Sequence, residues 1–192
     1  MISESELVRK CKEGEPRYQE MLYQRFSAVL MGICVRYAKN TEDAEDIMHD
    51  SFVKIFTNIG TYEGIGSLEA WVKRITVNTA INAYHLKVKT GFAVDVDEMQ
   101  GVITDVRIKE NDFLSESVLL QFINELPDGY RTIFNLYEID GYSHLEIAEM
   151  TGGTYSTVRS QLFKAKRALK KKIENYFGTE LKYYTDRNKS EK

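Results

Sequence analysis

The sequence is poor in the residues that break or cross-link a chain. It has two prolines, two cysteines and one tryptophan among 192 residues. Little of it alternates regularly between apolar and polar residues, which argues against a mostly β protein, whereas apolar residues recur at helical spacing almost throughout. We therefore predict an all-α protein with enough apolar residues to bury the cores of one large or two small domains.

Signs of a metal or catalytic centre are also lacking. Cys11 and Cys34 stand within expected helices, without a CxxC pair or a partner histidine, so we expect reduced, half-buried thiols and neither a metal site nor a disulfide framework. We see no paired catalytic carboxylates, no nucleophile with a partner base and no phosphate-binding glycine loop. The chain is therefore predicted to need no cofactor and not to be an enzyme.

Long hydrophobic runs are missing as well. No apolar segment approaches the ~20 residues that a helix needs to span a bilayer. The N-terminus, Met1-Ile-Ser-Glu-Ser-Glu, is acidic and polar and lacks the basic start and apolar core of a signal peptide. We expect a cytoplasmic protein without membrane insertion.

Charge is unevenly distributed along the chain. The formal net charge is -3, but the segment from Thr154 to Lys172 has no acidic residue and seven basic ones. This is the charge pattern of a helix laid against DNA phosphates. Taken alone, such a run is equally compatible with a solvated helix face.

The residues around the basic run have the pattern of a helix-turn-helix. Ser143 and Glu146 predict a capping box, Gly152 and Gly153 the turn, and Thr154 the cap of a second helix. Apolar residues at helical spacing predict the buried stripe of that helix: Val158, Leu162, Ala165, Leu169 and Ile173. Together these features favour DNA binding over a solvated face.

Capping and breaking signals divide the rest of the chain into helices. We predict them, in order, over residues 3–13, 18–37, 42–58, 67–88, 115–125 and 127–139. A glycine-punctuated loop, Gly60 to Gly66, precedes the fourth of these helices. After Tyr176 we predict a frayed tail.

Helical periodicity lapses between Lys89 and Asp112, where acidic residues and glycines predominate. We interpret this segment as a flexible acidic linker between two small helical domains, with an ordered loop packed on either domain as the alternative. The predicted organisation is an N-terminal domain over 1–89, a linker over 90–112, a C-terminal domain over 113–177 containing the helix-turn-helix, and a tail over 178–192.

Two helices of the N-terminal half carry polar patterns beyond packing. Asp43, Asp46 and Asp50, spaced i, i+3 and i+7, form an acidic stripe that would repel DNA and favour a basic protein partner, unless it is simply a solvated face. The following helix aligns Trp71, Arg74, Asn78, Asn82 and His85 along one side. The tryptophan ring offers a stacking surface, the asparagines offer amides and the arginine offers a cation, which together could hold an unpaired base. The alternative is that Trp71 is a buried core residue, as a lone tryptophan usually is.

Four segments resemble, in order and spacing, the extracytoplasmic-function class (group 4) of bacterial RNA polymerase sigma factors: Asp43 to Phe56, Leu68 to Asn82, Leu126 to Phe134 and Gly141 to Leu169. The resemblance implies a two-domain, all-helical subunit that binds core polymerase, directs promoter recognition and assists DNA opening. The alternative is a stand-alone helix-turn-helix regulator, which leaves the acidic stripe and the Trp71 helix unexplained. Gly153 replaces the branched apolar residue usual in the family's turn, which predicts a less rigid motif.

The resemblance implies residues for three binding surfaces. Residues expected on the clamp helices of the polymerase β′ subunit are Asp43, Asp46, His49, Asp50 and Phe52. Residues expected at the minus-ten element are Tyr62, Trp71, Arg74, Asn78 and Asn82. Residues expected in the major groove of the minus-thirty-five element are Ser156, Thr157, Arg159, Ser160, Lys164 and Arg167. The C-terminal domain is also expected on the β flap. Many family members are held inactive by an anti-sigma factor, and no residue here identifies one.

Overall fold

The computed structural model describes residues 2–89 and 115–190, and within these ranges every regular element is a helix. The chain divides into two compact units, Met1–Ala93 and Val94–Lys192. This confirms the predicted all-α, two-domain architecture. The predicted linker over 90–112 lies outside the described residues.

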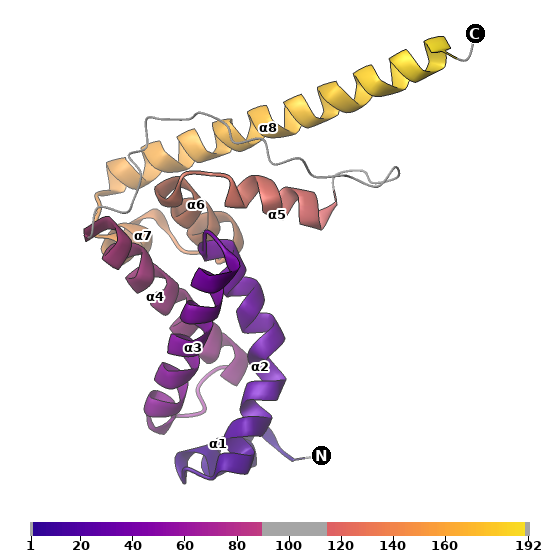
Figure 1. Cartoon of the computed structure of the whole chain (residues 1–192). Helices are drawn as coiled ribbons and strands as arrows, with labels where there is room; N and C mark the ends of the chain where they lie inside the picture. Colours follow the sequence, from indigo (N-terminus) through magenta and orange to yellow (C-terminus); the bar gives the residue numbers. More distant parts are fainter. Residues whose placement is uncertain (1, 90–114, 191–192) are drawn as a thin grey trace. The chain divides into compact units, whose positions relative to one another are not determined.

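Unit 1 is built from four α-helices. They are α1 (Glu4–Lys12), α2 (Pro16–Tyr37), α3 (Thr41–Asn58) and α4 (Leu68–Lys89), with the short 3₁₀-helix η1 (Ile59–Thr61) after α3. Each pair among α2, α3 and α4 is in contact, and α1 packs on α2 and η1 (Figure 1). Their shared core includes the fully buried Leu22, Leu30, Ile55, Leu68 and Val72.

Short polar side chains start the helices of unit 1 where the sequence predicts them. Ser3 accepts a hydrogen bond from the Glu6 amide at 3.2 Å, and Asn40 accepts one from the Asp43 amide at 2.8 Å. Ser67 accepts one from the amide of Ala70 at 3.1 Å. Because each cap satisfies an amide that has no partner within its helix, these residues fix where the helices begin.

Unit 2 consists of α5 (Glu116–Asn124), α6 (Asp128–Phe134), the π-helix η2 (Asn135–Ile139), α7 (His144–Thr151) and α8 (Tyr155–Ser190). Figure 1 shows α5, α6 and α7 against the first part of α8. The helix predicted over 127–139 therefore ends as a π-helix, in which the Asp140 amide reaches back to the Asn135 carbonyl. A cluster of buried side chains joins α6 to α8: Leu126, Tyr130, Ala165 and Ala168, with Phe134 packed against them.

The predicted frayed tail after Tyr176 is wrong, because α8 continues as a helix to Ser190 (Figure 1). Gly178 is the helix-breaking residue in this stretch. A single glycine destabilises a helix by only about 1 kcal/mol relative to alanine, so the helix can continue through it. Just before this stretch, two contacts hold α8 on α5. The Tyr176 ring meets the Phe122 ring edge-on at 5.7 Å, and the Lys172 ammonium lies 2.7 Å from the Glu125 carboxylate.

Both cysteines are free thiols and are buried more completely than the sequence predicts, with exposed fractions of 2% for Cys11 and 0% for Cys34. Burial raises the pKa of Cys34 to about 12, since the thiolate would lose its hydration. The two thiols therefore serve as small core residues of unit 1. None of the described helices combines the length and apolar character needed to cross a membrane.

Candidate functional surfaces

The helix α3 separates an apolar side from a polar one. Its buried side contains Ala44, Met48, Ser51 and Ile55, as the spacing predicts. The opposite side exposes Asp46, His49 and Asp50, which we call the α3 face. Two further carboxylates that the sequence analysis did not single out, Glu42 and Glu45, are exposed beside it. The result is an acidic surface on a well-anchored helix.

Two predicted members of this surface have other surroundings. The Asp43 carboxylate is half-buried and lies 2.6 Å from the Lys87 ammonium, so it joins the start of α3 to the end of α4. Phe52 is only 5% exposed, and its ring contacts those of Tyr23 and Phe56 at centroid distances of 4.5 and 5.8 Å. The helical spacing of Phe52 is compatible with either the buried or the exposed side of α3. In the structure its ring packs in the core.

The glycine-punctuated loop between η1 and α4 holds its shape through its own side chains. Gly64 and Gly66 adopt positive φ angles of 78° and 76°, which L-residues with side chains rarely tolerate. The Tyr62 hydroxyl donates to the Gly66 carbonyl at 2.9 Å, and its ring lies 5.5 Å from that of Trp71. Tyr62, which the resemblance places at the minus-ten element, is only 7% exposed and supports the loop from within. Ile65, between the two glycines, is instead 83% exposed.

The helix α4 presents the predicted polar residues together. Arg74, Asn78 and Asn82, spaced four residues apart, are exposed on one side, while Val72 and Thr76 are buried on the other. Trp71 is half-buried at the base of this row. Guanidinium and amide groups in such a row can meet phosphates and base edges, as the sequence analysis proposed.

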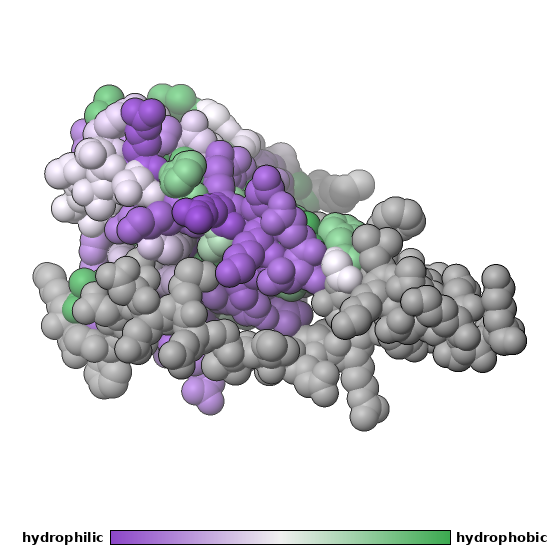
Figure 2. All heavy atoms as spheres, turned by 90° about the horizontal axis from the view of Figure 1, so that it is seen from above, coloured by the Kyte–Doolittle hydropathy of each residue, from purple (hydrophilic) through white to green (hydrophobic). Residues whose placement is uncertain are grey.

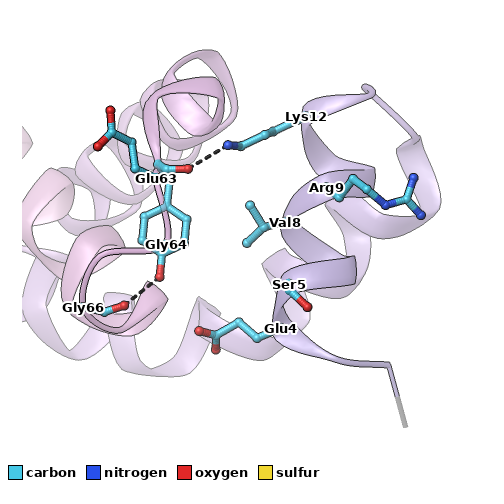
Figure 3. A pocket seen from close by; sticks show the side chains of 9 residues that line it. Glu4, Ser5, Val8, Arg9, Lys12, Glu63, Gly64 and Gly66 are labelled. Atoms are coloured by element: carbon cyan, nitrogen blue, oxygen red, sulfur yellow. Dashed lines mark hydrogen bonds between the residues drawn. The ribbon is translucent and has the colours of Figure 1, made fainter.

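A pocket of about 420 Å³ lies between α1 and the glycine loop (Figure 3). Val8 contributes an apolar patch to it, and the backbone of Gly64 and Gly66 forms the facing wall. Figure 3 shows the side chain of Lys12 reaching across to the loop, where its ammonium donates to the Tyr62 carbonyl at 2.7 Å. The sequence gives no sign of this contact.

The helix-turn-helix forms as the sequence predicts. The Ser143 hydroxyl accepts from the Glu146 amide at 3.3 Å, and the Glu146 carboxylate accepts from the Ser143 amide at 2.8 Å, which completes the capping box. Gly152 ends α7 with a left-handed φ of 68°. The Thr154 hydroxyl then accepts from the Thr157 amide at 3.1 Å and caps α8.

The first turns of α8 divide into a buried and an exposed side. The buried side carries the predicted stripe except for Ile173, which is half-buried: Val158, Leu162, Ala165 and Leu169. Every residue predicted for DNA contact is exposed: Ser156, Thr157, Arg159, Ser160, Lys164 and Arg167. Phe163, which the sequence analysis passed over, is 68% exposed among them. The sequence did contain a sign that Phe163 is exposed, because this residue does not share the helical spacing of the apolar stripe.

The basic run of α8 contains two kinds of residue. Lys166 lies 2.5 Å from the Glu138 carboxylate and 5.6 Å from the centre of the Tyr137 ring, so it ties α8 to η2. Lys172, paired with Glu125, ties α8 to α5 in the same way. Both lysines thus form ion pairs within unit 2. The other cations of the run include the exposed Arg159, Lys164, Arg167 and Lys171.

Polar contact is the chemistry that these surfaces offer. On the face of the molecule in Figure 2, hydrophilic residues predominate, and hydrophobic residues form small, separate patches. Within residues 2–89 and 115–190 no cluster of three or more histidine, cysteine or acidic side chains could hold a metal ion.

Comparison with known proteins finds sigma factors for both units. Residues 22–88 match the family model of sigma-70 region 2, and residues 117–169 match that of sigma-70 region 4. The RNA polymerase sigma-H factor of Pseudomonas aeruginosa is 27% identical over 183 residues, which cover 89% of this chain and 94% of that protein. The ECF RNA polymerase sigma-E factor of Haemophilus influenzae is 28% identical over 183 residues, covering 90% and 96%.

The fold is also similar to that of a solved sigma factor. The sigma factor RpoE of Bartonella quintana, crystallised with the anti-sigma factor NepR, aligns with a TM-score of 0.52 and 17% identity. The alignment covers 81% of this chain and 96% of that one.

Proposed function

The chain belongs to the sigma-70 family as an extracytoplasmic-function sigma factor, and on that premise we propose how its two units divide the work of transcription initiation. As a sigma factor it binds core RNA polymerase and directs it to promoters. We place it in group 4 of the family, which is the class its motifs resemble. Unit 1 holds the polymerase and opens the DNA, and unit 2 holds the upstream promoter duplex.

The α3 face docks on the clamp helices of the polymerase β′ subunit. Asp46, His49 and Asp50 support this assignment because they are exposed together on a capped helix whose other side is fixed in the core. An acidic surface is attracted to a basic protein and repelled by the phosphates of DNA. Asp43 and Phe52 act through the fold, the first through its pair with Lys87 and the second through its packing.

The glycine loop and the exposed row of α4 recognise and open the minus-ten element. Asn78 and Asn82 offer amides to the edge of an unpaired base, and Arg74 offers a cation to the backbone. The exposed Ile65 at the loop tip supplies an apolar contact for a base that has left the stack. Tyr62 and Trp71 support the loop from below through their ring contact.

The exposed side of α8 enters the major groove at the minus-thirty-five element. Arg159 and Ser160 contact base edges and Lys164 and Arg167 contact phosphates, with Ser156 and Thr157 at the helix start near the backbone. Phe163 adds an apolar contact of the kind that selects a thymine methyl group. We also assign unit 2 to the flap of the β subunit.

An anti-sigma protein is a further proposed partner. The support is the fold that this chain shares with the Bartonella quintana protein, which was crystallised with one. No residue of the described units singles out the surface that such a protein would cover.

One observation carries the proposal: the two units use the same kind of capped, half-buried helix but expose opposite charge, acidic on α3 and basic on α8. Run-off transcription from a genomic fragment library tests it, with purified core polymerase and this chain as the sole sigma factor. We expect discrete transcripts that share upstream sequence elements. A helix-turn-helix regulator would instead yield transcripts only when a second sigma factor is present, and that result would overturn the proposal.

A further inference from the structure

The helix α1 lies outside the part of the chain that matches sigma-70 region 2, which begins at residue 22. It nevertheless reaches both ends of the glycine loop. At the start of the loop, the Lys12 ammonium donates to the Tyr62 carbonyl at 2.7 Å. At its end, the Glu4 carboxylate accepts from the Leu68 amide at 3.4 Å. Glu4 and Lys12 are eight positions apart, about 12 Å along the helix axis, so the two contacts are made from opposite ends of α1.

The helix that makes these contacts is itself firmly held. Leu7, Val8 and Cys11 are buried, with exposed fractions of 2%, 7% and 2%. A second oxygen of the Glu4 carboxylate lies 2.7 Å from the Arg25 guanidinium on α2, which keeps this side chain turned toward the loop. The loop thus rests against a rigid element on the side where Figure 3 shows the pocket.

We propose that Lys12 and Glu4 are positioning residues that hold the glycine loop in the conformation that captures the unpaired minus-ten strand. The inference rests on the proposed function, since it concerns the same loop. Gly64 and Gly66 give that loop access to many backbone conformations, and ordering it on binding costs entropy. Bonds from α1 to both ends select one conformation before DNA arrives, which lowers the cost of binding.

Lys12 acts through the loop and not on the DNA itself. Its ammonium donates to a backbone carbonyl of the loop, a bond that lies wholly within the protein. The two roles differ in salt dependence. Each phosphate contact on a single strand contributes about 0.7 to the slope of log K against log salt, and a bond within the protein contributes none.

The experiment compares full-length variants in complex with core polymerase, on a promoter that the wild-type chain transcribes. Lys12→Met removes the donor while keeping the length of the side chain, and Lys12→Arg restores a donor. We expect Lys12→Met to slow open-complex formation about tenfold, in line with the loss of one charge-assisted hydrogen bond, and Lys12→Arg to recover most of the rate. Affinity for core polymerase stays unchanged.

Lys10→Met is the matched control. Lys10 sits on the same helix, but its ammonium bonds Glu15 and Glu13, which raise the pKa of Lys10 and keep it away from the loop. This variant should open promoters at the wild-type rate. At the other end of the loop, Glu4→Ala should slow opening more than Glu4→Gln, whose amide oxygen still accepts from the Leu68 amide.

Salt dependence separates positioning from direct contact. Binding to a promoter with a pre-melted minus-ten region should weaken in Lys12→Met without a change in its salt slope. A slope lower by about 0.7 would make Lys12 a phosphate contact and overturn the proposal, as would rates equal to those of Lys10→Met. Failure of the proposed function would look different, because the wild-type chain itself would then initiate nothing.

Discussion

Helices α3 and α8 are built alike and differ in what they expose. Each begins at a side-chain cap, Asn40 for α3 and Thr154 for α8, and each buries an apolar stripe against its own unit. The exposed sides carry opposite charge, with Asp46 and Asp50 on α3 and Arg159 and Arg167 on α8. The buried halves therefore specify the fold, and the charge on the exposed halves specifies what each unit can bind.

The two units also differ in how well their predicted contacts lie on the surface. All six residues predicted on α8 are exposed, whereas Phe52 and Tyr62 of unit 1 are buried. The six on α8 are charged or small and polar, and such side chains are seldom buried without a partner. An aromatic ring suits either a core or a binding site, so its position alone decides little.

Reversing charge on the α3 face is the strongest way to test the first half of this comparison. The double variant Asp46→Lys, Asp50→Lys should lose at least about 100-fold in affinity for core polymerase, because two attractive contacts to a basic partner become repulsive. Fluorescence anisotropy of the labelled chain titrated with core polymerase measures the loss. Far-ultraviolet circular dichroism should remain unchanged, since both side chains are exposed.

Glu20→Lys is the control for a single charge reversal on the α3 face, Asp46→Lys. Glu20 is exposed on α2, where its carboxylate accepts from the Gln24 amide, so the change makes the same alteration of net charge on a different helix. It should leave the affinity for core polymerase within about twofold, as expected for a surface charge outside the contact area. Equal losses for Glu20→Lys and Asp46→Lys would point to a general charge effect and remove the α3 face from the interface.

Arg159 and Lys166 test the second half, because both are cations of α8 with different partners. Arg159→Ala should weaken binding to the minus-thirty-five duplex by about 1–3 kcal/mol and relax its sequence preference, without changing affinity for core polymerase. Lys166→Ala should leave the salt slope of duplex binding unchanged, since this lysine is paired with Glu138. Gel-shift titrations at several salt concentrations measure both effects.

Arg167→Ala completes the series on α8. Its side chain is exposed, and the loss of one phosphate contact should lower the salt slope by about 0.9 and weaken all sequences alike. If Lys166→Ala lowered the slope as much as Arg167→Ala, the division of the basic run into internal and DNA-binding cations would be wrong.

Local features of this protein could be predicted from the sequence, and long-range contacts could not. The caps at Asn40, Ser143 and Thr154 depend on residues within one turn of helix, so pattern alone locates them. The bond of Lys87 to Asp43 joins residues 44 apart, and that of Lys12 to Tyr62 joins residues 50 apart. No spacing rule connects such positions, which is why the sequence showed neither Lys87 as the partner of Asp43 nor the contact of α1 with the glycine loop.

The connections that precede α4 and α8 differ in how strictly they need glycine. In unit 1 both Gly64 and Gly66 have positive φ angles, whereas in the turn of unit 2 Gly152 does and Gly153 does not. A Cβ at Gly153 would meet only the Thr151 hydroxyl, at an ordinary contact distance of 3.6 Å. The turn thus has room for a Cβ at this position, and Gly153 increases the conformational freedom of the unfolded chain without being required by the folded one.

Substitution of the two neighbouring glycines should therefore act in opposite directions. Gly153→Ala should stabilise the motif by about 0.4–1 kcal/mol, because it narrows the unfolded ensemble at a compatible φ, and Gly152→Ala should destabilise it by about 1–2 kcal/mol through left-handed strain. Amide hydrogen exchange in α7 measures both locally, with slower exchange expected in the first variant and faster in the second. Destabilisation by Gly153→Ala would mean that α7 and α8 need a conformation at this position that only glycine allows, and the turn of unit 2 would then be as demanding as the loop of unit 1.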